Sequence, residues 1–411
     1  MKDSFPADLV NPVQNKPASS LLCPVYLLLF FLITPVFCFA QEEEIPPFEL
    51  RRQQAGYYGP EAEEPEPEDI EEVLVTYFGP GEADHPKYGD FWTSLQIAEQ
   101  TINSGGGIHG KPLRILPVWT EDPWKGGISD MVRMIYEQRI WAMIGSVDSA
   151  STHLLEQVAA RARIPVINPV STDKSANLAN VPWLFSLLPG DHLLAKVMIR
   201  KIKSLLPDDQ DSFILISGTD HDSRLLSKEV KTLLSVEKLV PQYMFEYHPA
   251  AALPWDLISS ETSFFIVIAP PEESAFLVRE IRGRSFSGRI IGGPFIGRNR
   301  FAELCGKDGE GLFYVSPGES RPGSDFSAEF RNITGYDPDY AAGSIYDAVM
   351  ILSDALKKSG LNRVLLLQEV RNLTPWTGVT GIVTWDPLGQ NTRPGSIKIF
   401  TRKTSAAGIH D

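Results

Sequence analysis

Residues 141–168 read WAMIGSVDSASTHLLEQVAARARIPVIN, and this stretch decides the fold. Residues 141–145 and 164–168 are apolar runs as long as buried strands, whereas 152–161 spaces its apolar residues with the period of a helix. The order strand, helix, strand predicts two parallel strands in a sheet that helices cover on both faces.

The same alternation continues in both directions along the chain. Toward the N-terminus it predicts strands 73–77 and 113–119 and helices 90–103 and 128–138. It restarts after Pro189-Gly190 and predicts, in order, helix 192–206, strand 212–216, helix 224–235, strand 263–269, helix 272–282 and strands 289–292 and 312–316. We therefore expect an α/β protein of two Rossmann-like lobes, each with a parallel central sheet.

A further helix is predicted after the second lobe. It spans 340–358, with Asp337 as its N-cap and Pro338 in its first turn. Because this helix follows the second set of strands, we expect the chain to return to the first lobe, so that the two lobes are interleaved.

The N-terminal 72 residues differ from the rest of the chain. No charged residue occurs between Leu21 and Ala40, which predicts a secretory signal peptide over residues 1–40; an uncleaved membrane anchor is the alternative. Residues 41–72 carry twelve acidic side chains, two arginines and five prolines, which predicts a disordered acidic linker. The folded protein should therefore begin near Val73.

The charge of the folded part argues against nucleic acid as a partner. The net charge of −14 falls mostly on the linker, so the folded part is only mildly acidic, and it has no basic stripe that would indicate nucleic acid as a partner.

Cys305 is the one cysteine after the predicted leader, so no disulfide can form within the folded part. Its place at an apparent helix end favours a buried structural cysteine over a catalytic thiol.

Two segments rich in hydroxyl groups follow predicted strands. They are 145–152 and 168–173, and each leads toward a helix. In open parallel sheets ligands bind beyond the carboxyl ends of the strands, and hydroxyls with backbone N–H groups at a helix N-terminus suit a carboxylate. Taken alone, each segment is explained by N-capping, because Ser, Thr and Asp also cap helices when no ligand is present. Their occurrence after neighbouring strands favours a shared anion site.

Motifs of catalysis are missing from the sequence. It contains no Gly-x-Ser-x-Gly elbow, no P-loop and no dinucleotide-binding fingerprint, and its seven histidines have no paired metal-ligand spacing. We therefore predict a protein that is not an enzyme and that uses neither a cofactor nor a metal.

An ordered set of motifs resembles the type I periplasmic solute-binding proteins, in particular the branched-chain amino-acid (Leu/Ile/Val) binding group of ABC transporters. The resemblance covers roughly residues 73–400. The matching segments are 88–90 leading to 103–112, 121–123, 144–145 with 149–152, 164–169, 340–342 with 346–348, and 378–386.

The resemblance implies two lobes that close over a ligand, joined by three crossovers near 186–190, 316–320 and 376–381. The lobes would comprise residues 73–187 with 319–378, and 188–318 with 379–411. It also implies a monomer in the periplasm that works with the membrane permease of an ABC transporter.

The resemblance places half of a binding site. Family members hold the carboxylate of an amino acid with hydroxyl residues that match Ser149, Ser171 and Thr172, with backbone help from Val170. Tyr88 would form an aromatic wall of the site, or else a buried aromatic on the hinge side.

The other half of the predicted binding site differs from the family pattern. Phe295 stands after Gly293-Pro294, where an acidic residue commonly binds the ammonium group of the ligand, and Asp148 stands where a cysteine is expected. A loop that often carries tyrosine matches 220–222 instead. Our hypothesis is that Asp222, or failing that Asp148, replaces the missing acid.

These observations predict an exported receptor that binds an amino acid or related small carboxylate and hands it to an ABC-type permease. The alternative is a sensory binding protein that signals occupancy to a membrane partner without transport. An exported enzyme on the same scaffold has no motif in its favour.

Overall fold

The computed structural model describes residues 69–401, except 121, 179–181, 207–211, 251–252, 259–261, 285 and 287. The predicted signal peptide and the linker up to residue 68 lie outside the described residues. None of the described helices combines the length and the apolar character that a membrane span requires. The first strand begins at Val73.

The first lobe is a five-stranded parallel sheet in the order β2-β1-β3-β4-β5. The strands are β1 (Val73–Phe78), β2 (Leu113–Val118), β3 (Ala142–Gly145), β4 (Val166–Asn168) and β5 (Leu184–Ser186). The helices that precede the second lobe are α1 (Gly89–Ser104), α2 (Pro123–Tyr136), α3 (Ser149–Ala162) and α4 (Ser175–Leu178). Helix α3 begins three residues earlier than the sequence predicts, so Ser149 lies in its first turn.

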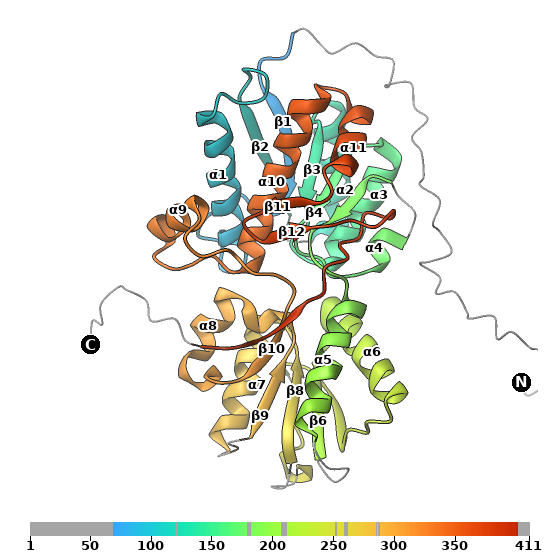
Figure 1. The fold of residues 1–411 in the computed structure, drawn as a ribbon, viewed down its shortest axis with the longest axis vertical. Helices are drawn as coiled ribbons and strands as arrows, with labels where there is room; N and C mark the ends of the chain where they lie inside the picture. The colour runs from blue at the N-terminus through green and yellow to red at the C-terminus, as the bar shows by residue number, and fades with distance from the viewer. Residues whose placement is uncertain are drawn as a thin grey trace, which may run out of the picture. The chain divides into compact units, whose positions relative to one another are not determined.

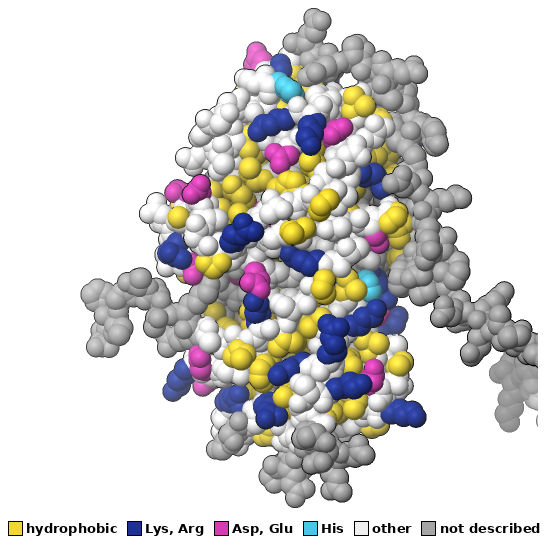
Figure 2. Space-filling model, viewed as in Figure 1, with side chains coloured by type: hydrophobic (Ala, Val, Ile, Leu, Met, Phe, Trp, Pro, Cys, Tyr) yellow, Lys and Arg dark blue, Asp and Glu magenta, His cyan; other side chains and the backbone are white. Residues whose placement is uncertain are grey.

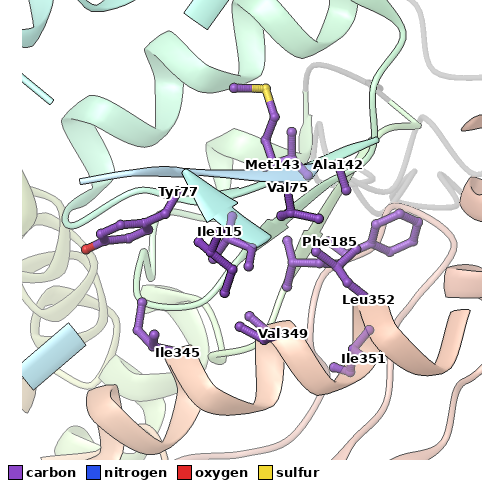
Figure 3. Packing of buried hydrophobic residues seen from close by; sticks show 14 of the residues in the cluster. Val75, Tyr77, Ile115, Ala142, Met143, Phe185, Ile345, Val349, Ile351 and Leu352 are labelled. Atoms are coloured by element: carbon purple, nitrogen blue, oxygen red, sulfur yellow. The ribbon is translucent and has the colours of Figure 1, made fainter. Parts of the chain in front are cut away.

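The chain returns to this lobe after the second one, as expected. Helices α9 (Asp325–Thr334), α10 (Tyr340–Ser359) and α11 (Arg363–Asn372) contribute buried residues to the same hydrophobic core as β1–β5. In Figure 3, Ile345 and Val349 of α10 face Tyr77 and Ile115 of the sheet. Both faces of the sheet are thus covered, which explains why β1 and β3 read as nearly continuous apolar runs.

The second lobe has a six-stranded sheet in the order β13-β10-β9-β8-β6-β7, drawn below the first lobe in Figure 1. Its strands are β6 (Ser212–Gly218), β7 (Tyr243–Tyr247), β8 (Thr262–Ile268), β9 (Arg289–Gly292), β10 (Phe313–Ser316) and β13 (Ser396–Ile399), of which only β13 pairs antiparallel. Its helices are α5 (Asp191–Leu205), α6 (His221–Val236), α7 (Pro271–Gly283) and α8 (Asn299–Cys305). The predicted α/β class with parallel central sheets is confirmed.

Alternation along β6 divides the interior of the second lobe into two cores. Phe213 and Leu215 pack with residues of α5 and α6, whereas Ile214 and Ile216 pack with residues of α7 and α8. Side chains that alternate between the two faces of a strand require both faces to be covered. Cys305 is a free, buried thiol within the second of these cores.

Helix α5 is amphipathic. Its inner residues, among them Leu194, Met198 and Ile202, are buried in the core, while Lys196 and Arg200 are exposed. Figure 2 shows Lys and Arg side chains gathered on the face of the second lobe where α5 lies. The basic residues of this helix therefore form its solvated face.

The predicted N-cap of α10 is wrong. Asp339 caps this helix, because its carboxylate accepts hydrogen bonds from the backbone N–H groups of Ala341 and Ala342, each over 2.9 Å. Asp337 instead accepts from Arg331 Nε over 2.7 Å. The helix begins at Tyr340, so Pro338 lies before the cap and not in the first turn of the helix.

The end of the chain is divided differently from the prediction, which assigns all of 379–411 to the second lobe. Val383 and Trp385 belong to the core of the first lobe, and Trp385 Nε1 donates to the carbonyl of Ser186 over 2.9 Å. The short hairpin of β11 (Trp376–Gly378) and β12 (Gly381–Val383) ends at Val383, and the chain reaches the second sheet only at β13. The hairpin is too short for its apolar pattern to indicate which lobe it joins.

Candidate functional site

The hydroxyl segments lie at the carboxyl ends of two adjacent strands, β3 and β4. Ser149 is fully buried and Ser171 is 2% exposed, and Ser171 Oγ donates to Ser149 Oγ over 2.8 Å. Asn168 fixes the second segment, because its Oδ1 accepts from the backbone N–H of Ser171 over 2.9 Å. The structure thus brings together two of the predicted ligand-binding side chains.

Thr172 and Val170 lie elsewhere in the same loop. Thr172 Oγ1 donates to Asp191 Oδ1 over 2.7 Å, at the start of α5 in the second lobe. Burial raises the pKa of the Asp191 carboxyl well above its usual value. The Val170 side chain is partly exposed and packs on the core of the first lobe. The Thr172 hydroxyl is therefore engaged in a contact between the lobes and does not join the two serines.

Asp222 of the second lobe reaches the serine pair. Its Oδ2 accepts a hydrogen bond from the backbone N–H of Ser149 over 3.3 Å. Burial, together with the negative charges of Asp148 and Asp220, raises the pKa of Asp222 to about 7. Because Ser149 is in the first turn of α3, its N–H is one of the free donors of the helix end, and here a carboxylate of the protein itself occupies it.

Asp148 has a structural task. It is the N-cap of α3, and its Oδ1 accepts from the backbone N–H of Ser151 over 2.8 Å and also from the Ser151 hydroxyl. Capping of this kind stabilises a helix without any ligand. The capping interpretation therefore holds for Asp148, whereas the serines have a contact that capping does not explain.

Tyr88 is part of an aromatic group beyond β1 and β2. Its ring stacks on His85 with centroids 5.3 Å apart, and it contacts the edge of Trp119 at 6.3 Å. Burial, and after it the charge of Asp148, raises the pKa of the Tyr88 hydroxyl. Phe295 lies in a short 3-10 turn, Pro294–Gly297, directly after β9, and is partly exposed.

Two further acids lie at the carboxyl end of the second sheet, and neither is among the predicted ligand-binding residues. Asp220 Oδ2 and Glu273 Oε2 are buried atoms without a hydrogen-bond partner among the described residues, and both approach Gly218 at the end of β6. Burial, and then the charges of Asp220 and Glu272, raises the pKa of Glu273 to about 6. The position of Glu273 just after an apolar strand is the same signal that identifies the serines.

A buried ion pair joins the lobes on another side. Arg298 precedes α8, and its Nε donates to Asp339 Oδ2 over 2.8 Å, with side chains that are 10% and 1% exposed. The guanidinium also lies 4.7 Å from the ring centroid of Phe91. Asn299 Nδ2 donates to Asp90 Oδ2 over 3.3 Å. This group could not be predicted from the sequence, because its members come from three separate segments.

One set of possible metal ligands occurs within the described residues. His153, Asp173 and His221 each offer one ligand atom, and these atoms lie within 4.8 Å of one another. The residues come from α3, from the loop after β4 and from α6, so no local spacing in the sequence could have indicated them.

Comparison with known proteins places this geometry in context. A family model described as periplasmic binding protein matches residues 88–398. An amino acid binding protein of Pseudomonas aeruginosa PAO1 is 21% identical over 338 residues, which are 78% of this chain and 87% of that protein.

Solved structures share the fold. The leucine-binding protein LivK of Thermotoga maritima MSB8 aligns with a TM-score of 0.68 at 20% identity, over 80% of this chain and 95% of that one. A solute-binding protein of an ABC transporter from R. palustris, in complex with benzoate, aligns with a TM-score of 0.68 at 14% identity, over 81% and 94%. The family and these structural neighbours are binding proteins.

Proposed function

Because this chain belongs to the periplasmic binding protein family, we propose that it is an exported receptor that captures an amino acid or related small carboxylate between its lobes. It would act as a monomer in the periplasm and deliver the ligand to an ABC-type permease. Closure of the lobes over the ligand would shift the population toward the form that the permease accepts.

The observation that carries the proposal is the carboxylate of Asp222 on the backbone N–H of Ser149. This N–H lies at the N-terminus of a fourteen-residue helix, where the helix dipole favours negative charge. The hydroxyls of Ser149 and Ser171 lie beside it. A ligand carboxylate would accept hydrogen bonds from the same donors, so the Asp222 carboxylate marks the position where the ligand carboxylate would bind.

The position of Asp222 also supports an amine on the ligand. In an α-amino acid the carboxylate and the ammonium group are attached to one carbon, so the group that binds the ammonium must lie close to the donors that bind the carboxylate. Asp222 meets this requirement, whereas the Asp148 carboxylate is already engaged as the N-cap of α3. When a ligand carboxylate replaces Asp222 on Ser149, Asp222 would remain near enough to accept from the ammonium.

Asp220 and Glu273 support a polar ligand over a purely aliphatic one. Each has a buried carboxylate oxygen without a hydrogen-bond partner among the described residues. Buried acceptors of this kind are costly unless a donor reaches them. A ligand whose side chain carries N–H or O–H groups would supply the donor.

A ligand screen by thermal unfolding tests the proposal. We expect the full-length chain to be stabilised by an α-amino acid with a polar or basic side chain more than by leucine or benzoate. A ligand at a hundred times its Kd adds about 2.7 kcal/mol to the free energy of unfolding, which raises Tm by roughly several degrees. If benzoate alone raises Tm, the statement that the ligand carries an amine is wrong. If no carboxylate raises Tm, the proposed function is wrong.

Substitution of Asp222 tests its role separately. Asp222→Asn is expected to weaken binding of an amine-bearing ligand about ten- to hundredfold, because a hydrogen bond to a charged group contributes about 1.5–3 kcal/mol. Titration calorimetry gives the two Kd values. Asp148→Asn is the matched control, because asparagine keeps an oxygen that can cap α3, so both the stability and the Kd should stay nearly unchanged. Equal Kd values for Asp222→Asn and the unaltered chain would eliminate Asp222 as the ammonium partner.

A further inference from the structure

Three side chains from the two lobes converge beside the serine pair. His153 and Asp173 belong to the first lobe, and His221 begins α6 of the second. His153 Nε2 lies 2.7 Å from Asp173 Oδ2, and His221 Nε2 lies 3.3 Å from the same oxygen. One carboxylate oxygen and two imidazole nitrogens therefore point at a common region.

A second carboxylate orients the first histidine. Glu156 Oε2 lies 3.1 Å from His153 Nδ1, the nitrogen that does not face Asp173. Metal-binding histidines almost always donate their other ring N–H to a carboxylate, a backbone carbonyl or water, which fixes the ring and the tautomer. Glu156 is 6% exposed, and its other oxygen, Oε1, has no hydrogen-bond partner among the described residues.

We propose that His153, Asp173 and His221 bind a divalent transition-metal ion, with Zn²⁺ as the best-suited one. Two imidazoles and one carboxylate suit Zn²⁺, whereas Mg²⁺ and Ca²⁺ prefer oxygen ligands alone. Metal–ligand distances of about 2.0–2.1 Å in a tetrahedron separate ligand atoms by roughly 3.3 Å. The His221–Asp173 contact already has that length, and the His153–Asp173 contact would lengthen slightly.

The surroundings leave room for a fourth ligand. A surface pocket of about 640 Å³ is lined by His153, Glu156 and His221, with Trp124 among the others. Water or a small anion in this pocket would lie against the two histidines, and a site of three protein ligands with one open position is typical of accessible zinc centres.

A proton is the competing occupant of this site. Hydrogen bonding to Asp173, and then to Glu156, raises the pKa of His153 to about 10, so without metal the ring is a cation between two carboxylates. An incoming metal must displace this proton. The ion would then replace the contact between His221 and Asp173, which joins the two lobes, by stronger metal–ligand bonds.

Metal binding would favour the closed arrangement, because its ligands come from both lobes. Lys174 and Glu229 support the same contact with an ion pair of 2.8 Å. By linkage, an ion that binds better to the closed form also raises affinity for a ligand held between the lobes. This coupling rests on the proposed function, whereas the metal site itself does not.

Calorimetric titration of the full-length chain with ZnCl2 tests the site, with protein that carries no histidine tag and has been freed of metal. We expect one Zn²⁺ per chain. His221→Ala, at a side chain that is 42% exposed, should bind at least about tenfold more weakly, and Glu156→Gln about ten- to hundredfold more weakly. His248→Ala is the matched control, because His248 is an exposed histidine on another part of the lobe.

Three results would overturn the proposal. If the unaltered chain takes up no Zn²⁺, or if His248→Ala weakens binding as much as His221→Ala does, the three residues are not a metal site. If His153→Ala abolishes binding while His221→Ala leaves it unchanged, the ion is held by one lobe and does not join the two. Because the probe is the metal alone, these results do not depend on whether an amino acid binds.

Discussion

Arg298→Met is expected to lower the free energy of unfolding by about 3–5 kcal/mol, because it leaves Asp339 as an unpaired buried charge. The Asp339 side chain is 1% exposed, and its Oδ2 accepts from both Arg298 Nε and the backbone N–H of Asn299. Methionine keeps most of the volume and the contact with Phe91. Urea unfolding, monitored by far-UV circular dichroism, measures the loss.

A second variant separates charge from packing. Asp339→Asn keeps an oxygen that can cap α10, so the double variant Arg298→Met with Asp339→Asn removes both charges and retains the cap. We expect it to be more stable than Arg298→Met alone. A loss below about 1 kcal/mol for Arg298→Met would mean that this pair contributes no more than a surface ion pair.

Ser149→Ala is expected to weaken binding of a carboxylate ligand about ten- to hundredfold, because a hydrogen bond to a charged group contributes about 1.5–3 kcal/mol. The backbone N–H of Ser149 remains, so binding should be reduced and not abolished. The Kd is measured by calorimetry with the ligand that the thermal screen identifies.

Ser204→Ala is the control for this experiment, because Ser204 is an exposed serine on α5 far along the helix from the site. Thr172→Val adds a sharper comparison. Its hydroxyl bonds Asp191 and not the serines, so the variant should affect stability more than Kd. If Thr172→Val weakens binding as strongly as Ser149→Ala does, the loop changes its conformation when ligand enters.

Much of the fold could be predicted from the sequence because most of its strands are buried on both faces. Residues 264–269 form an unbroken apolar run, and β8 occupies Thr262–Ile268. Strand β5 has three residues, too few to establish a period, and it was not predicted. The antiparallel strand β13 was missed as well, because its residues are half-buried and carry no continuous apolar run.

The site was predictable only where position along a strand determines position in space. Ser149 and Ser171 follow adjacent strands, and they do meet. Thr172 is next to Ser171 in sequence, yet its hydroxyl reaches Asp191, since neighbouring side chains in a loop point in different directions. The histidine pair with Asp173 arises from the contact of two lobes, which no spacing within either lobe encodes.

The return of the chain to the first lobe has a consequence for how the protein is made. Val349 of α10 packs in the same core as Val75 of β1, and the entire second lobe lies between them in the sequence. During synthesis one face of the first sheet is therefore only partly covered until α10 is made, when the second lobe is already nearly complete. Contacts of such long sequence separation form slowly and leave aggregation-prone surface exposed in the meantime. A nascent chain that ends at residue 316 would contain all five strands of the first sheet and still lack the helix that buries them.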